Sequence, residues 1–255
     1  MRDIVKKIDE SSKYVIFTVG DSVTEGVGLK NDEVTYTAAL ARGIAEIYPE
    51  RSVLRYDGKR HCTCDAELLP IKKFEGPIVL RTGRDKSITV VRCGIGGNTA
   101  KRLLNRKSDF IGRRIDGKLA NLILICVGIN DSLKEDSEKY ATDKEYEENL
   151  NCLIDEIKTA MPNTDIILMT PTYNDLGISQ KSSLDSYAHE MISKAKERQI
   201  PVIDLHKMWM EHMVIGGDNY GQGDWLSGRK GDCCHPSAQG HLAIANEILR
   251  CLWRA

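Results

Sequence analysis

Short apolar runs recur along the chain, and longer segments of mixed character separate them. The runs are bounded by glycine, proline or polar residues, as buried strands usually are. They predict strands at residues 14–19, 87–92, 122–127, 165–170 and 201–204. Segments between them carry apolar residues at helical spacing and predict helices near residues 34–48, 100–105, 143–160 and 182–199. Strands that alternate with helices in this order predict a parallel sheet covered on both faces.

Two of the helical segments predict which of their side chains are buried. In the segment 143–160 the apolar residues recur every three or four positions, and the predicted core face consists of Tyr146, Leu150, Leu153, Ile154 and Ile157. The last helix is expected to begin after Ser237, a serine being a favoured N-cap. Its predicted buried side chains are Leu242, Ala245, Leu249 and Leu252.

The region 51–86 departs from the alternation of strands and helices. Residues 52–56 and 77–81 resemble two further strands, and a polar stretch with His61, Cys62 and Cys64 separates them. We interpret the region as an inserted β-hairpin with a long loop. Such a loop either decorates the fold or forms a rim over a site or an oligomer contact, and long loops in compact domains tend to carry function. The expected organisation is one domain, residues 1–255, with this insertion.

Composition and charge restrict the class of protein. The chain has 255 residues, 41% of them hydrophobic, which is enough for a large core. Its 36 Lys and Arg residues balance 37 Asp and Glu residues, so no nucleic-acid partner is expected. No apolar signal-peptide region or membrane-spanning run occurs. The eight cysteines are scattered and predict reduced thiols, hence a cytoplasmic protein without membrane association.

Polar residues with catalytic potential follow two of the predicted strands. Ser22, in Gly20-Asp21-Ser22, comes directly after the strand 14–19, and Asn130 follows the strand 122–127. Asp232 and His235 lie in a loop before the last helix. Each of these could be an ordinary turn or capping residue when taken alone. Their joint placement favours a serine hydrolase, because open α/β folds hold their sites at the carboxyl ends of strands.

These blocks resemble the SGNH, or GDSL, hydrolase family, in the subgroup that contains carbohydrate O-acetyl esterases. All four family blocks occur in order: Gly20-Asp21-Ser22, Gly94 to Thr99, Gly128-Ile129-Asn130-Asp131 and Asp232 to Pro236. Two positions depart from the usual pattern, with Arg92 where asparagine is frequent and Gly96 where serine is frequent. The nucleophile elbow of the α/β-hydrolase fold does not fit, because Thr24 occupies its last glycine position.

The resemblance implies a three-layer α/β/α sandwich with a flavodoxin-like parallel sheet, and an ester hydrolase mechanism. Ser22 would be the nucleophile and His235 its base, with Asp232 orienting the imidazole. The oxyanion hole would consist of the Ser22 and Gly97 backbone N–H groups and the Asn130 side-chain amide. Acyl transfer of this kind requires no cofactor, and none is expected.

Two other readings of the same loops are weaker. Gly94 and Gly96 begin a pattern like a dinucleotide fingerprint, but its third glycine is missing and no P-loop ending follows. The cysteines near His235 and at residues 62 and 64 lack the paired Cys-x-x-Cys spacing of structural zinc sites. No metal is therefore expected.

The substrate is less well defined by the sequence than the chemistry. Asp21, Tyr173 and Trp225 are candidate substrate-binding residues, since they lie in or beside segments that follow strands or lead to His235. Only 6% of the residues are aromatic, and the sequence shows no long apolar groove. We therefore expect a short-chain ester, an acetylated saccharide above all. A lysophospholipase or acyl-thioesterase, an inactive carbohydrate-binding module, and the formation of a homo-oligomer all stay open.

Overall fold

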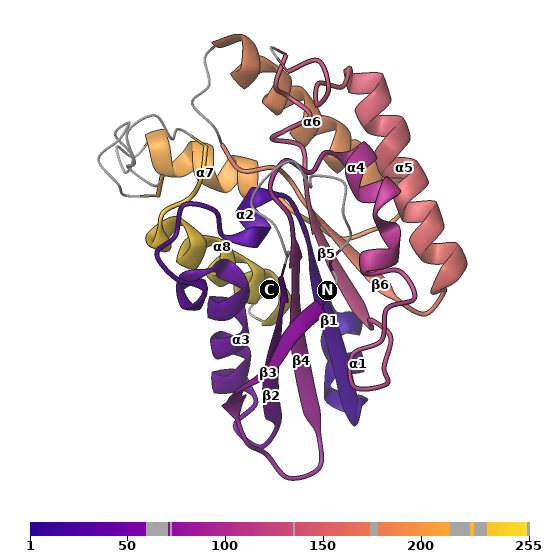
Figure 1. The fold of residues 1–255 in the computed structure, drawn as a ribbon, viewed down its shortest axis with the longest axis vertical. Coiled ribbons are helices and arrows are strands. Elements are labelled where there is room, and N and C mark those ends of the chain that lie inside the picture. The colour runs from indigo at the N-terminus through magenta and orange to yellow at the C-terminus, as the bar shows by residue number, and fades with distance from the viewer. Residues whose placement is uncertain are drawn as a thin grey trace.

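The computed structural model describes residues 1–59, 71, 73–134, 136–173, 178–214, 225–226 and 234–253. These residues form one seven-stranded sheet with the order β3-β2-β4-β1-β5-β6-β7 (Figure 1). Its strands are β1 (Lys13–Gly20), β2 (Ser52–Lys59), β3 (Lys73–Arg81), β4 (Ser87–Gly94), β5 (Leu122–Cys126), β6 (Asp165–Met169) and β7 (Val202–Ile203). Every neighbouring pair is parallel except β2 and β3, which pair antiparallel.

The strand order confirms the predicted fold class. When β2 and β3 are set aside, the remaining strands have the order β4-β1-β5-β6-β7, which is the flavodoxin-like order 2-1-3-4-5. The predicted hairpin is the pair β2–β3. It extends the sheet beyond β4, because β2 also pairs in parallel with β4, Ser52 opposite Ser87.

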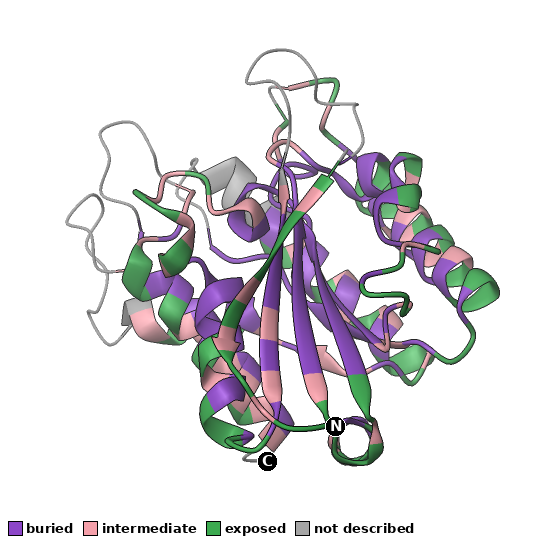
Figure 2. Cartoon of the chain, turned by 60° about the horizontal axis from the view of Figure 1, so that its bottom comes forward, coloured by how far each residue is buried: buried purple, intermediate pink, exposed green. Residues whose placement is uncertain are grey.

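Helices cover both faces of the sheet and make the three layers (Figure 1). The helical elements are α1 (Arg2–Glu10), α2 (Ser22–Glu25), η1 (Asp32–Val34), α3 (Tyr36–Ile47), α4 (Ala100–Asn105), η2 (Lys107–Asp109), α5 (Asp143–Ala160), α6 (Ile178–Glu197), α7 (Leu205–Val214) and α8 (Ala238–Trp253). Successive side chains of a strand point to opposite faces. Accordingly Tyr14 and Ile16 of β1 pack with α1, α3 and α8, while Val15 and Phe17 pack with α4 and α5. Figure 2 shows the central strands buried and the edge strand β3 largely exposed.

The helix α5 agrees with its prediction in both limits and buried face. Its side chains Tyr146, Leu150, Leu153, Ile154 and Ile157 are buried. A capping box closes its amino end, in which the Thr142 hydroxyl and the Glu145 carboxylate accept each other's backbone N–H. The periodic apolar face and the cap therefore specify the same helix.

The helix α8 agrees only in part. Ser237 caps it as predicted, since the Gly240 N–H donates to its hydroxyl at 3.1 Å. Ala245 and Leu252 are buried as expected, but Leu242 is 50% exposed and its predicted burial is wrong. The buried face is rotated from the predicted one: it includes Ile244 and Ile248. Leu249 is partly buried and packs against the core.

Among the helices of the described residues, none combines the length and apolar character that crossing a membrane requires.

Candidate active site

The blocks that contain Ser22, Gly97 and Asn130 follow three neighbouring strands. β1 is central, with β4 on one side and β5 on the other. Gly20, the last residue of β1, lies opposite Gly94 of β4 and Cys126 of β5. The three parallel strands therefore end level, and their following loops share one edge of the sheet (Figure 1). This edge is the expected position for a site in an open α/β fold.

Ser22 is the first residue of α2, a single helical turn that directly follows β1. The Asp21 carboxylate caps this turn by accepting the Val23 N–H at 2.9 Å. Glycine is required at position 20, because an added Cβ would lie 2.4 Å from the Cys126 carbonyl oxygen. Thr24 shares a 3.0 Å hydrogen bond with the Tyr36 hydroxyl, which anchors α2 to α3. Ser22 is thus held at a sharp strand-to-helix turn.

Gly97 lies in a tight turn after β4. The Asn98 N–H donates to the Ile95 carbonyl at 3.2 Å and closes a four-residue turn. Gly97, the third residue of the turn, has φ of +79°, the value that a type II turn requires and that glycine adopts without strain. Its carbonyl accepts a 3.0 Å bond from Arg102. Its N–H has no acceptor among the described residues.

Asn98 connects all three blocks, and sequence reasoning did not identify it. Its side-chain amide donates to the Gly20 carbonyl at 2.9 Å, and its own carbonyl accepts from Asn130 Nδ2 at 3.0 Å. Arg106 donates to the Asn98 side-chain oxygen at 3.1 Å. Asn98 is buried, and all of these bonds fix its orientation. One Asn130 amide hydrogen is therefore held in place, which directs the second.

His235 lies at the entrance to α8 and is partly exposed. It precedes Pro236, which forms a bridge with Leu226, and Ser237, whose N–H donates to the Trp225 carbonyl at 2.7 Å. These contacts and the N-cap of α8 fix the backbone on the carboxyl side of His235. Asp232 lies outside the described residues, so its pairing with His235 stays a prediction.

A second imidazole, His241, is buried in the first turn of α8, beyond His235. The Tyr36 backbone N–H donates to His241 Nδ1 at 3.1 Å, and the two rings stack. Burial, with smaller contributions from His235 and Arg92, lowers the pKa of His241 to about 3. His241 is therefore neutral and packs α8 against α3, which agrees with the helix-packing role typical of a histidine without a motif.

Two buried carboxyl groups accompany the loops of the candidate site. Burial raises the pKa of Asp21 to about 7, and it does the same for Asp131. Asp131 accepts the Ala100 N–H at 3.0 Å and so anchors the amino end of α4 beside the Gly97 turn. Both residues support backbone positions of the site.

The three candidate substrate-binding residues are all engaged in contacts within the protein. Asp21 caps α2, as described above. Tyr173 is 2% exposed and belongs to the core between β6 and α7. Trp225 stacks on His212 with ring centroids 3.6 Å apart and meets Trp209 edge-on at 5.0 Å. Substrate contact by these residues stays a prediction, and the packing gives Trp225 a clear role in anchoring its loop.

The described residues contain no group of three or more His, Cys, Asp or Glu side chains arranged to hold a metal ion.

The comparison with protein families identifies the chain. The model of the family described as GDSL-like lipase/acylhydrolase matches residues 16–248. The chain belongs to this family. It is therefore a carboxylic ester hydrolase, and the family identification from the four sequence blocks is confirmed.

Solved structures of similar fold include other hydrolases. Axe2, an acetylxylan esterase from Geobacillus stearothermophilus, has a TM-score of 0.64 and 24% sequence identity, with 93% of each chain covered. LAE5, an α/β hydrolase enzyme from the metagenome of Lake Arreo in Spain, has a TM-score of 0.63 and 21% identity, with 94% of each chain covered. At these sequence identities, the similarity shows only that the two proteins share the fold of this chain. No curated protein matches it in sequence.

Proposed function

We propose that this GDSL hydrolase is a serine esterase that removes short acyl groups, acetyl above all, from carbohydrate esters. The observation that carries the proposal is the convergence of Ser22, the Gly97 turn and Asn130 at the level ends of three parallel strands. The nucleophile and two further oxyanion donors come from separate blocks, and Asn98 links those blocks directly.

The proposed reaction proceeds through a covalent acyl-enzyme. His235 accepts the Ser22 hydroxyl proton as the Ser22 oxygen attacks the ester carbonyl carbon. The resulting oxyanion receives hydrogen bonds from the N–H groups of Ser22 and Gly97 and from Asn130. The tetrahedral intermediate collapses, and His235 returns the proton to the leaving alcohol. Water, activated by His235, then attacks the acyl-Ser22 carbonyl and releases the carboxylic acid and the free serine.

Solved Axe2 structures support the assignment of the triad. They include catalytic mutants in which a serine, an aspartate and a histidine were each replaced by alanine. These residues occur in that order in the Axe2 chain, and the aspartate and histidine have the spacing of Asp232 and His235 here. The proposed triad therefore matches that protein in residue type and order and in the spacing of aspartate and histidine.

The exposed surface favours a short acyl group over a lipid. The large hydrophobic side chains exposed in the described part of the chain are scattered over separate elements: Val27, Ile47, Val79, Tyr140 and Leu242. A long acyl chain would need a contiguous apolar surface. The carbohydrate part of the proposal draws on the acetylxylan and acetyl-xylooligosaccharide esterases of the same fold.

An ester panel tests the proposed substrate class. We expect kcat/KM on p-nitrophenyl esters to be highest for acetate and to fall with acyl length, and acetylated xylooligosaccharides to be deacetylated. Ser22→Ala serves as the control for background hydrolysis. An optimum at about eight or more acyl carbons would instead support a lysophospholipase or thioesterase, because each buried CH2 of a long acyl chain would then contribute about 0.8 kcal/mol to binding. Absent turnover with intact saccharide binding would support a binding module.

A further inference from the structure

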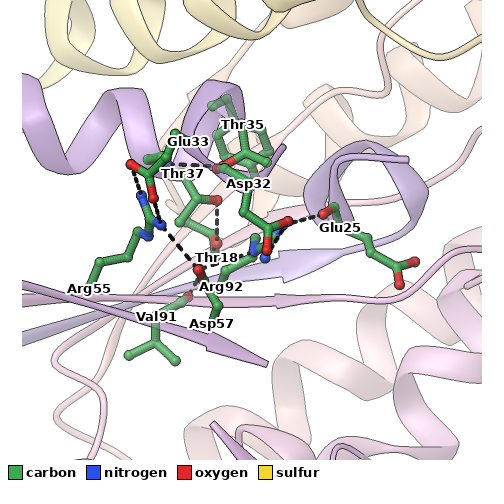
Figure 3. Close-up of polar contacts among 12 residues, drawn as sticks. Thr18, Glu25, Asp32, Glu33, Thr35, Thr37, Arg55, Asp57, Val91 and Arg92 are labelled. Carbon is green, nitrogen blue, oxygen red and sulfur yellow. Dashed lines mark hydrogen bonds and ion pairs between the residues drawn. The ribbon is translucent and has the colours of Figure 1, made fainter. Parts of the chain in front are cut away.

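A buried network of charged residues lies directly beneath the loop that follows the nucleophile helix (Figure 3). At its centre is Arg92, on β4 and 3% exposed. The Arg92 Nε donates to Asp57 at 3.1 Å, and Nη2 pairs with Asp32 at 2.9 Å. The third nitrogen, Nη1, donates to the backbone carbonyl of Glu25 at 2.5 Å. All three guanidinium nitrogens are therefore engaged, and one of them holds the last residue of α2.

The outer part of the network, Arg55 and Glu33, stabilises the inner part, Asp57 and Arg92. Arg55 on β2 is fully buried and makes a bidentate contact with the Glu33 carboxylate. Its Nη2 donates to Oε1 at 2.5 Å and its Nη1 to Oε2 at 3.1 Å. Arg55 also lies 3.2 Å from the second oxygen of Asp57. Asp57 thus bridges the two arginines, so that each buried charge has a partner, as burial of charge requires.

Glu25 extends the network to the oxyanion turn. Its carboxylate Oε2 accepts the Gly96 N–H at 2.5 Å. The approach of α2 to β4 is close, because a Cβ added to Gly94 would lie 2.2 Å from the Glu25 nitrogen. One residue therefore joins the nucleophile helix through its backbone to Arg92 and through its side chain to the turn that holds Gly97.

The turn needs such a contact because its central residues are both glycine. Type I and type II turns differ by a flip of the central peptide, here Gly96–Gly97, and the flip reverses the direction of the Gly97 N–H. Glycine at both positions tolerates either arrangement, so side-chain sterics do not select one. A fixed acceptor for the Gly96 N–H, together with Arg102 on the Gly97 carbonyl, restrains the peptides on both sides of the flip.

We propose that Glu25 is a positioning residue of the oxyanion hole, which it serves by holding Gly96 so that the Gly97 N–H faces the substrate carbonyl. Arg92 fixes Glu25 in this role. The inference rests on the proposed function, since it assigns Gly97 to the oxyanion hole. It also gives Arg92, one of the two departures from the family pattern, a structural role.

The test compares acceptor and non-acceptor side chains at position 25. Glu25→Met keeps the volume but removes the acceptor, and it should lower kcat on p-nitrophenyl acetate by roughly 10- to 100-fold with KM changed less than about threefold. Glu25→Gln retains an acceptor oxygen and should remain within about threefold of wild-type kcat. Thr142→Ala, which removes the N-cap of α5 outside this network, should lower the melting temperature while leaving kcat unchanged.

Two results would overturn the inference: wild-type kcat in Glu25→Met, or an equal kcat loss in Glu25→Gln and Glu25→Met. If Glu25→Met does not fold, Glu25→Ala provides the same comparison. Asn130→Ala, measured in parallel, separates this inference from the proposed function. A kcat loss in Asn130→Ala with none in Glu25→Met contradicts only the role of Glu25. No loss in Asn130→Ala contradicts the oxyanion hole itself.

Discussion

Asn130 is the side chain on which the proposed oxyanion hole depends most directly. One of its amide hydrogens is committed to the Asn98 carbonyl, and the second is directed by that contact. Asn130→Ala should lower kcat by roughly 10²–10³ with a much smaller change in KM, because the donated bond strengthens in the transition state. Asn130→Asp should be at least as harmful, since a carboxylate would repel both the oxyanion and the Asn98 carbonyl. Steady-state kinetics on p-nitrophenyl acetate measure both effects.

A purely structural role of Asn130 gives a different result. It predicts a lower melting temperature with kcat nearly unchanged in the folded fraction. A thermal melt of each variant, beside its kcat, decides between the roles. A loss of stability without a loss of kcat would remove Asn130 from the site.

The residues that sequence reasoning identified are those that would touch the reacting atoms. Ser22, Gly97 and Asn130 follow strands in recognisable blocks, so their convergence could be predicted. The roles of Asn98 and Glu25 could not be predicted, because both act on backbone groups of segments that are distant in sequence. Nothing in the sequence distinguishes such a side chain from other polar residues near it. Asp21 and Tyr173 illustrate the reverse case, since their position near strand ends gave no indication that both would be buried.

At the scale of elements, we expect α8 to connect stability to catalysis, because its N-cap lies two residues after the proposed base His235. Ser237→Ala removes the hydroxyl that accepts the Gly240 N–H and should cost about 1 kcal/mol of stability. Fraying of this turn would also let His235 move away from Ser22. We therefore expect kcat to fall by roughly a few-fold, because a less well oriented base reacts more slowly. Denaturant unfolding and ester kinetics on the same preparation measure the two effects.

The cap of α5 provides a matched control for this prediction. Thr142→Ala removes a cap of the same kind from a helix whose amino end holds no proposed catalytic residue. It should reduce stability by a similar amount without changing kcat. Equal kcat in the Ser237→Ala variant and the wild type would show that the α8 cap does not position His235.

The helices also show how far an apolar pattern predicts a buried face. α5 packs against α4 and α6, and its buried residues all belong to the apolar face that its periodicity predicted. α8 packs against α3, α1 and β7, and its buried face is rotated from the predicted one. Gly240 is buried on this face because its lack of a side chain lets the Trp225 backbone and the Trp209 ring approach closely. His241 is buried there too, where it accepts the Tyr36 N–H. A histidine and a glycine carry no apolar signal, so the predicted face included Leu242 instead.

For the whole molecule, the alternation of strands and helices predicted a parallel sheet, and the family resemblance implied its flavodoxin-like strand order. The strand against which the hairpin pairs was not predicted. The sequence indicated strands at 52–56 and 77–81, but only the structure shows β2 in parallel pairing with β4. The buried charges Arg55, Asp57 and Arg92 explain the difficulty, since they make this part of the sheet read as polar surface.

The buried carboxyl groups make the stability of the fold depend on pH. The pKa of Asp21 and of Asp131 is raised to about 7 by burial, against about 3.9 for an unfolded aspartate. Between roughly pH 4 and 7 the folded chain therefore binds more protons than the unfolded chain. The free energy of unfolding should fall as pH rises through this window, by up to about 1.4 kcal/mol per pH unit for each group. Above it both states are ionised, and this contribution stays constant.

Asp131→Asn tests this dependence, because asparagine still offers an acceptor to the Ala100 N–H and has no charge to bury. The variant should lose less stability than the wild type between pH 5 and 7.5, roughly the upper part of the titration window. Asp136→Asn is the control, since the hydrogen bond from Lys139 lowers the pKa of that carboxyl out of this range. Identical slopes for the wild type and Asp131→Asn would contradict the buried-carboxyl explanation.

The most direct test of the central claim is to locate the covalent adduct of a fluorophosphonate by peptide mass spectrometry. The proposed mechanism predicts one adduct, on the peptide that contains Ser22, with loss of esterase activity in proportion to labelling. The Ser22→Ala protein should remain unlabelled and inactive. An adduct on another residue that accounts for the inactivation, or ester hydrolysis by Ser22→Ala at the wild-type rate, would contradict the account.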